Sequence, residues 1–215
     1  MKGLVLTSTE GERLEGLHRF ERAYWAEGCV RIAGIDEVGR GPWAGPVVAA
    51  CVVIEAPLLL AGLSDSKRVP ERRRELLAEQ IAAQAASYHI ASASVAEIDR
   101  LNIGVATKLA MERALAGVAV VPDIVLVDAV HLPTYAGRQQ AIIGGDGLSA
   151  VIAAASIVAK VFRDRLLCEL DQAYPLYGFA RHKGYGTAAH MAALRAHGPT
   201  IEHRRSFAPI RALCS

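Results

Sequence analysis

The stretch that organises the chain is Gly34-Ile35-Asp36-Glu37-Val38-Gly39-Arg40-Gly41-Pro42-Trp43-Ala44-Gly45-Pro46. An apolar run leads into it, two adjacent carboxylates lie within it, and a second apolar run at 47–54 follows it. Carboxylates at the end of a buried strand are costly unless they bind a cation or are otherwise paired. Glycines allow a backbone to come close to another group. The stretch therefore predicts a hard metal ion beside an anionic ligand.

Two more acids follow apolar, strand-like runs. Asp128 comes directly after 124–127, and Asp146 follows 141–143. Ligands of an α/β sheet gather where neighbouring strands end, so Asp36, Glu37, Asp128 and Asp146 are expected to cluster. Such oxygen ligands suit Mg²⁺ or Mn²⁺ rather than Zn²⁺. Any one of the acids could instead cap a helix or pair with an arginine, but the four positions together favour a metal site.

The adjacency of Asp36 and Glu37 raises a geometric problem. Neighbouring residues of a strand point to opposite faces of the sheet, so both side chains should not reach one site. We therefore expect the backbone to depart from regular strand geometry between Asp36 and Gly41, where glycines favour a local break. A straight strand with Glu37 facing away would remove Glu37 from the ligand set.

The order of apolar runs predicts an α/β fold with a mixed five-stranded sheet flanked by helices. The first three strands should form an antiparallel meander, and the last two should add in parallel.

Thr9 and Glu12 resemble a capping box, and Gly104 is a weak point in its helix. Strands are expected at 31–35, 47–54, 88–95, 124–127 and 141–143, and helices at 9–27, 70–86, 97–118, 149–170, 187–197 and 207–213.

Composition sets broad limits on the class of protein. The 215 residues are 52% hydrophobic, enough for one large domain or a domain with an appendage. No apolar run is long enough to span a bilayer, and the N-terminus lacks the order of a signal peptide. Four scattered cysteines without metal-site spacing predict buried free thiols in a reducing compartment, and hence a cytoplasmic protein.

Positive charge is concentrated in the C-terminal quarter. From residue 160 onward there are nine Lys and Arg against four acids, about +5, while the remainder carries 15 − 18 = −3. This asymmetry suits a phosphate-rich partner, although a solvated helical face is an equal alternative.

Three further patterns have two interpretations each. Ser156, Lys160, Arg163 and Asp164 share one helix face, where the cations could contact phosphate or lie at the edge of an apolar surface. Gly39-x-Gly41-x-x-Ala44 loosely matches a dinucleotide fingerprint, but a strand rather than a helix follows. The last pattern resembles a nucleic-acid stacking surface or an aromatic core under a loop; it comprises Tyr174, Tyr177, Phe179 and Tyr185, interleaved with Arg181, His182 and Lys183.

The motifs as a set resemble ribonuclease HII, the type 2 ribonuclease H family. The resemblance covers about residues 30–210 in order. It rests on Gly34-Ile-Asp-Glu-Val-Gly-Arg-Gly-Pro with Ala44-Gly-Pro-Val, Leu63-Ser-Asp-Ser-Lys67, Leu126-Val-Asp128, Gly145-Asp146, Ala154-Ala-Ser156-Ile-Val-Ala-Lys160-Val-Phe-Arg-Asp164, Tyr177-Gly-Phe179, His182-Lys-Gly-Tyr185 and His203-Arg-Arg-Ser-Phe207.

The resemblance implies an RNase H-like fold and a two-metal endonuclease. Such an enzyme hydrolyses the RNA strand of RNA–DNA hybrids and cuts on the 5′ side of a ribonucleotide embedded in duplex DNA, leaving 3′-hydroxyl and 5′-phosphate ends. Asp36, Glu37, Asp128 and Asp146 match the family's ligands for Mg²⁺ or Mn²⁺. Asp36 would contact both ions, Glu37 and Asp128 would complete one site, and Asp146 the other.

Substrate-binding residues are carried over in the same way. Gly39, Arg40 and Gly41 match the loop that reads the 2′-hydroxyl, and Tyr185 matches an aromatic that stacks on the adjoining deoxyribose. The additional candidates for substrate contact are Lys67, Ser156, Lys160, Arg163 and Lys183.

The chain departs from the family pattern in three places. Ala129-Val130 stands where Gly-Asn commonly follows the aspartate, Ser64 replaces an Asn, and Gly144 and Gly147 flank Asp146. These differences bear on substrate contacts and on the geometry of Asp146.

The expected organisation has three parts: an N-terminal helical extension at 1–28, a catalytic core at 29–174, and a helical appendage at 175–215 that contributes to nucleic-acid binding. We expect a monomer with no evident protein partner and no membrane association. Two other functions compete with the nuclease hypothesis, a non-catalytic module that binds hybrid duplexes and a small-molecule phosphotransferase or nucleotide binder. The first would need a disrupted acidic set, and the second rests only on the loose glycine pattern.

Overall fold

A computed structural model describes residues 7–214, so the predicted extension at 1–28 begins outside the described residues. The strands are β1 Ile32–Val38, β2 Val47–Ile54, β3 Ser87–Ala93, β4 Ile124–Asp128 and β5 Gln139–Ile142. The α-helices are α1 Ser8–Leu17, α2 Arg19–Ala26, α3 Glu71–Gln84, α4 Val95–Leu101, α5 Ile103–Ala116, α6 Ala150–Ala173, α7 Phe179–His182, α8 Ala188–His197 and α9 Ala208–Arg211. Two short 3₁₀ turns, η1 Ser66–Arg68 and η2 Gly145–Gly147, complete the elements.

The five strands form one mixed sheet in the order β3-β2-β1-β4-β5. β1 pairs antiparallel with β2, and β2 pairs antiparallel with β3. β4 lies parallel to β1 and β5 lies parallel to β4. The predicted meander followed by two parallel strands is therefore confirmed. Because β1 and β4 are parallel neighbours, their carboxyl ends open at the same edge of the sheet.

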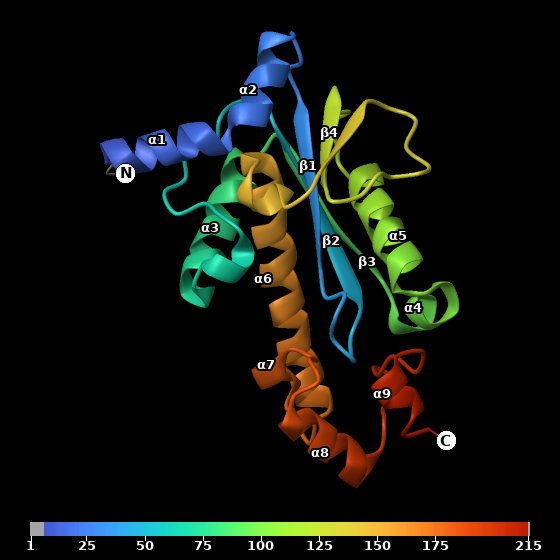
Figure 1. The fold of residues 1–215 in the computed structure, drawn as a ribbon. Coiled ribbons are helices and arrows are strands. Elements are labelled where there is room, and N and C mark those ends of the chain that lie inside the picture. The colour runs from blue at the N-terminus through green and yellow to red at the C-terminus, as the bar shows by residue number, and fades with distance from the viewer. Residues whose placement is uncertain (1–6, 215) are drawn as a thin grey trace.

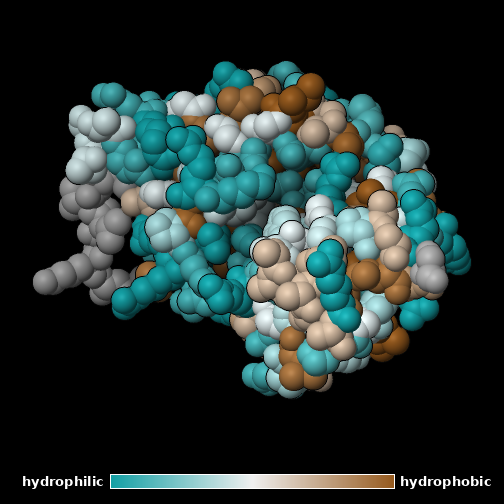
Figure 2. All heavy atoms as spheres, turned by 60° about the horizontal axis from the view of Figure 1, so that its bottom comes forward, coloured by the Kyte–Doolittle hydropathy of each residue, from teal (hydrophilic) through white to brown (hydrophobic). Residues whose placement is uncertain are grey.

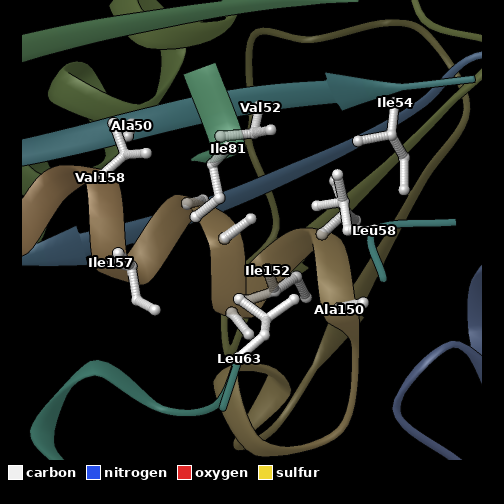
Figure 3. Packing of buried hydrophobic residues seen from close by; sticks show 14 of the residues in the cluster. Ala50, Val52, Ile54, Leu58, Leu63, Ile81, Ala150, Ile152, Ile157 and Val158 are labelled. Atoms are coloured by element: carbon white, nitrogen blue, oxygen red, sulfur yellow. The ribbon is translucent and has the colours of Figure 1, made fainter. Parts of the chain in front are cut away.

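Helices cover both faces of the sheet (Figure 1). One face is covered by α6 together with α3 and the N-terminal helices, and the other by α4 and α5. Figure 3 shows the first layer, in which Ala50 of β2 lies beside Val158 of α6 and Val52 of β2 lies beside Ile81 of α3. A Cβ on Gly34 would stand 2.4 Å from the Val151 carbonyl carbon, so this glycine permits the close packing of α6 on β1.

Two predicted helices are broken. The expected helix at 9–27 is interrupted at His18, whose buried ring contacts the Leu14 carbonyl through Nδ1 at 2.7 Å and accepts the Leu58 N–H at Nε2. The expected helix at 97–118 begins instead at Val95, with a Ser94 capping box, and it is broken at Asn102, close to the weak point expected at Gly104. Asn102 adopts φ 70° and caps the following helix. The N-cap of the first helix is Thr7, so the capping box proposed for Thr9 is wrong.

The C-terminal helices pack at the far end of α6 (Figure 1). Their cluster of buried side chains includes Phe179, Leu194 and Ile210, packed against Leu167 of α6 and against Ala44 in the loop that follows β1. The C-terminal segment thus adjoins the organising stretch of the sequence.

None of the helices within residues 7–214 is both long and apolar enough to cross a membrane. All four cysteines are free thiols, as predicted. Only Cys51 is buried, however, and Cys214 is exposed, so the expectation of burial is wrong for the others.

Candidate active site

Three of the four predicted acids meet at the carboxyl edge of the sheet. The register pairs Ile35 with Val127, so Asp36 and Asp128 follow at neighbouring positions on parallel strands. One carboxylate oxygen of each of Asp36, Glu37 and Asp128 lies within 4.8 Å of the others. Asp36 is buried, whereas Glu37 and Asp128 are partly exposed.

Glu37 joins this group although β1 is regular where both acids lie. Asp36 pairs with Ala50, Glu37 with Ala49 and Val38 with Val48, so no bulge separates the two acids. Pairing between β1 and β4 stops at Ile35. The edge of β1 beyond that point is open, and the longer Glu37 side chain can reach around it. The backbone leaves strand geometry at Gly39, which has φ 91°; the break falls inside the expected interval, but after both acids.

Crowded and buried carboxylates oppose ionisation in the cluster. Burial raises the pKa of Asp36 well above its ordinary value, and the negative charges of Glu37 and Asp128 raise it further, against a hydrogen bond with Ser156. Burial also raises the pKa of Glu37, which the nearby Arg40 lowers and Asp128 raises. A divalent cation would compensate this repulsion. The donor set, three carboxylates and no nitrogen or sulfur ligand, fits Mg²⁺ or Mn²⁺.

Ser156 supports Asp36 from the second turn of α6. Its buried hydroxyl lies 2.9 Å from the hydroxyl of Ser66 in η1, and as a neighbour of Asp36 it lowers the pKa of that carboxyl group. Asp36 Oδ1 additionally accepts the N–H of Glu37 at 2.7 Å. Ser156 therefore lies beside the Asp36 carboxylate, and its contact with substrate stays a prediction.

Asp146 lies beside the cluster without belonging to the close group. It occupies η2 after β5, and its Oδ2 is 3.6 Å from Lys67 Nζ. The preceding Gly145 N–H donates to Asp128 Oδ1 at 2.7 Å, which ties this turn to the end of β4. Burial, followed by the charge of Asp65, raises the pKa of Asp146, which Lys67 lowers. Apart from this ion pair Lys67 is exposed to solvent, and its contact with phosphate stays a prediction.

The loop after β1 connects the acids to an exposed aromatic ring. Arg40 Nη1 lies 3.3 Å from Glu37 Oε1, so the loop begins in contact with the cluster. A Cβ on Gly41 would meet only the Tyr185 ring, at 3.6 Å. Tyr185 is 47% exposed, whereas Tyr177 and Phe179 are buried in the C-terminal cluster. The aromatic pattern is therefore mostly a small core, and Tyr185 is its most exposed ring, whose stacking on a ligand stays a prediction.

The remaining predicted cations differ in their placement. Lys160 Nζ lies 2.7 Å from Asp164 Oδ1, and Lys183 Nζ lies 3.2 Å from Cys168 Sγ; both side chains are partly buried. Arg163 is fully buried, and its guanidinium donates to the carbonyls of Ala44, Pro46 and Lys183. Its predicted role in phosphate contact is therefore wrong, because no donor edge is exposed.

The face seen in Figure 2 is hollowed and bordered mainly by hydrophilic residues.

Sequence reasoning missed three side chains of the site region. Ser66 contacts Ser156, Asp65 borders Asp146, and Arg204 is buried against the loop after β1. The first two lie in the Ser-Asp-Ser-Lys motif, of which the sequence predicts substrate contact only for Lys67. Arg204 lies in His203-Arg-Arg-Ser-Phe207, where nothing in the sequence marks which arginine is buried.

The fold and the site together define a class of protein. A mixed sheet in this strand order, with clustered carboxylates at the carboxyl ends of its central parallel strands, is that of a ribonuclease H-like nuclease. The family model for Ribonuclease HII matches residues 33–210. The chain belongs to the ribonuclease HII family, and it is a nuclease, a hydrolase of the ribonuclease H type.

Individual relatives agree with this assignment. The chain is 56% identical over 202 residues to Ribonuclease HII of Desulfitobacterium hafniense (strain DSM 10664 / DCB-2), covering 94% of this chain and 78% of the relative. The ribonuclease H2 structure from Pyrococcus horikoshii OT3 has a TM-score of 0.73 at 26% identity, covering 85% and 96% of the two chains. The RNase HII of Archaeoglobus fulgidus, solved in complex with PCNA, gives 0.68 at 27% identity, covering 81% and 92%.

Proposed function

We propose that the protein is a divalent-metal-dependent endoribonuclease that cuts the RNA strand of RNA–DNA hybrids and the 5′ side of single ribonucleotides embedded in duplex DNA. Water would attack the phosphorus atom, and the bond from phosphorus to the 3′-oxygen would break. The products would carry a 3′-hydroxyl on the upstream strand and a 5′-phosphate on the ribonucleotide. Family membership supports the ribonuclease H activity, and the arrangement of the site supports the finer specificity.

The observation that carries this proposal is the contact between the acid cluster and the loop after β1. Glu37, near the end of β1, connects the two: its carboxylate has an oxygen within 4.8 Å of the other two acids and lies 3.3 Å from Arg40 of the loop. A ribose held against Gly41 and Tyr185 would therefore stand beside the carboxylates. Discrimination and cleavage would be coupled, because the same strand end supports both.

The four acids have distinct tasks in this proposal. Asp36, the buried central carboxylate, would contact both ions; Glu37 and Asp128 would complete one site and Asp146 the other. When bound, the ions would lower the pKa of the attacking water and stabilise the charge on the leaving 3′-oxygen. Ser156, whose hydroxyl lies beside the Asp36 carboxylate, would keep that carboxylate oriented.

Recognition would fall to the loop and to the C-terminal segment. The 2′-hydroxyl distinguishes RNA from DNA, and main-chain groups of Gly39, Arg40 and Gly41 would bind it. Tyr185 would stack on the neighbouring deoxyribose, which gives the segment 175–215 its share in nucleic-acid binding. The exposed Lys67 would contact a phosphate, helped by the excess positive charge of the C-terminal quarter. Free thiols throughout suit a reducing compartment, and we place the protein in the cytoplasm.

The proposal is tested on three substrates of one sequence: duplex DNA, the same duplex with one ribonucleotide, and an RNA–DNA hybrid. With Mg²⁺ or Mn²⁺ the second and third should be cut and the first should not, and a chelator should stop all cutting. Primer extension should succeed from the new 3′-hydroxyl. Cleavage that persists in chelator, or equal cutting of all-DNA duplex, would refute the proposal.

A further inference from the structure

Two fully buried arginines lie beneath the loop at 39–46. Arg163 comes from α6 and Arg204 from the C-terminal segment, and each has 0% of its surface exposed. Neither forms an ion pair with a carboxylate within residues 7–214. Burying an unpaired charge is costly, and burial lowers the pKa of Arg163 to about 10 and that of Arg204 to about 9. Such a cost calls for a compensating role.

Main-chain carbonyls of the loop take the place of carboxylates. Arg204 donates to the carbonyls of Gly39, Arg40 and Gly45, at distances of 2.6 to 2.9 Å. These contacts join the two ends of the loop across one planar guanidinium. The main-chain N–H of Arg204 donates to the Trp43 carbonyl at 2.8 Å. Arg204 therefore contacts the beginning, the middle and the end of the loop at 39–46.

Arg163 joins this loop to the one that carries Tyr185. It donates to Ala44 and Pro46 on one side and to the Lys183 carbonyl, at 3.0 Å, on the other. The Trp43 N–H donates to the Gly184 carbonyl at 2.8 Å and reinforces the connection. The two buried guanidinium groups therefore fix the position of Gly41 relative to Tyr185.

The glycines of the loop fall into two kinds in consequence. A Cβ on Gly39 would stand 2.2 Å from Arg163 Nε, so this residue is glycine because the arginine lies against it, and its φ of 91° reinforces the requirement. A Cβ on Gly41 would touch only the Tyr185 ring. Gly39 thus faces the supporting arginines, and Gly41 faces the side on which a ligand would lie.

We propose that Arg204, together with Arg163, is a positioning residue that sets the spacing between the main chain at Arg40–Gly41 and the Tyr185 ring, and thereby the preference for a ribonucleotide over a deoxyribonucleotide. The inference rests on the proposed function of this loop. Lysine cannot replace either residue, because one ammonium group cannot reach carbonyls at both ends of a loop as a planar guanidinium does. The four acids of the proposed metal site lie on β1, β4 and η2, and the Arg204 guanidinium donates to main-chain carbonyls and to none of them.

The test compares Arg204→Lys with Arg205→Lys, an exposed neighbour as the matched control. Steady-state cleavage of a duplex with one ribonucleotide is measured, together with binding of the same duplex and of all-DNA duplex in Ca²⁺. Arg204→Lys should raise KM about 10-fold or more and reduce the preference for the ribonucleotide duplex by a similar factor. The value of kcat and the Mn²⁺ titration midpoint should stay near those of the parent. Arg205→Lys should behave as the parent does.

Unchanged ribonucleotide preference in a folded Arg204→Lys protein would overturn the inference. If that variant does not fold, Asp99→Ala provides the second arm, because Asp99 accepts the N–H groups of Arg205 and Ser206 and so holds the segment that carries Arg204. It should raise KM several-fold with kcat retained, and no change in KM would count against the inference. A parent protein that cuts no ribonucleotide duplex would refute the proposed function instead, so the two failures are distinguishable.

Discussion

Mild acid should destabilise the protein through a buried pair of histidines behind Tyr185. His203 and His190 face each other with their Nε2 atoms 3.0 Å apart. His203 Nδ1 accepts the Thr200 N–H at 3.0 Å, and His190 Nδ1 donates to the Tyr185 carbonyl at 2.9 Å. These partners require both rings to be neutral, with His203 Nε2–H donating to His190. A proton added to either ring would set two donors against each other.

The size of the effect follows from the pKa of His203. Burial, followed by the neighbouring His190, lowers this pKa from 6.5 to about 4. Between these two values the unfolded chain holds the proton and the folded protein does not, so stability falls as the pH falls. Integrating from about pH 7.5 to about pH 5 gives a loss of about 2 kcal/mol from His203 alone. The pKa of His190 is also lowered, chiefly by burial, and acts in the same direction.

The assay is urea unfolding near pH 7.5 and near pH 5 for the parent, His203→Gln and His197→Gln. His197 lies exposed on α8 and serves as the control. His203→Gln should be less stable than the parent at the higher pH, yet should lose about 2 kcal/mol less on acidification. Carboxylate titration is common to all three proteins and cancels in the comparison. Equal losses in all three would refute this reasoning.

Three other predictions concern the acid cluster and its surroundings. Asp36→Asn should raise the Tm of the metal-free protein, because it removes a crowded buried charge. Mg²⁺ or Mn²⁺ should raise the Tm of the parent more than that of the variant. A lower Tm of the metal-free variant would argue against repulsion in the cluster. Ala129→Gly should stabilise the protein by about 1 kcal/mol in urea unfolding, because Ala129 adopts φ 56°, a left-handed conformation; no gain would contradict strain there. Lys67→Met should leave stability within about 0.5 kcal/mol, since the Lys67 side chain is 80% exposed and its Nζ is 3.6 Å from Asp146. The variant should bind duplex more weakly, and unchanged binding would remove Lys67 from the phosphate contacts.

The sheet could be predicted because its signals are local. The β-branched run at 47–54 is buried along its whole length in β2, and the order of the apolar runs gave the correct strand pairing. Helix breaks could not be placed in the same way. His18 ends a helix through its contact with Leu58, forty residues away, and Asn102 breaks another by adopting a positive φ. Neither contact nor dihedral is visible in hydrophobic periodicity.

The site shows the same division. Asp36 and Asp128 follow from strand ends, which the sequence indicates directly. Glu37 joins them from a regular strand, just past the point where β4 stops pairing with β1 at Ile35. The alternation rule suggested a bulge that the structure does not contain. Asp146 lies next to the cluster but outside its close group, and its ligand role stays a prediction.

The buried arginines were the least predictable part of the molecule. Arg163 and Arg204 resemble the surface cations around them in sequence, and a basic helix face suggested phosphate contact for the first. Only the three-dimensional structure shows that main-chain carbonyls surround both groups. An arginine near a nucleic-acid site can therefore hold the conformation of a loop through its main-chain carbonyls instead of binding phosphate.

The central claim is that the carboxylate cluster around Asp36 is the active site at which a strand is cut next to a ribonucleotide. One comparison tests this claim most directly. Cleavage of a duplex carrying a single ribonucleotide is measured in Mg²⁺ and in Mn²⁺ for the parent, Asp36→Asn and the exposed control Glu12→Gln. The cleavage rate of Asp36→Asn should fall by more than roughly 100-fold, because loss of a residue that only supports a metal ligand already costs up to about that factor. The variant should remain folded and still bind the duplex. Glu12→Gln should match the parent. Cleavage by Asp36→Asn at the parental rate would contradict the account.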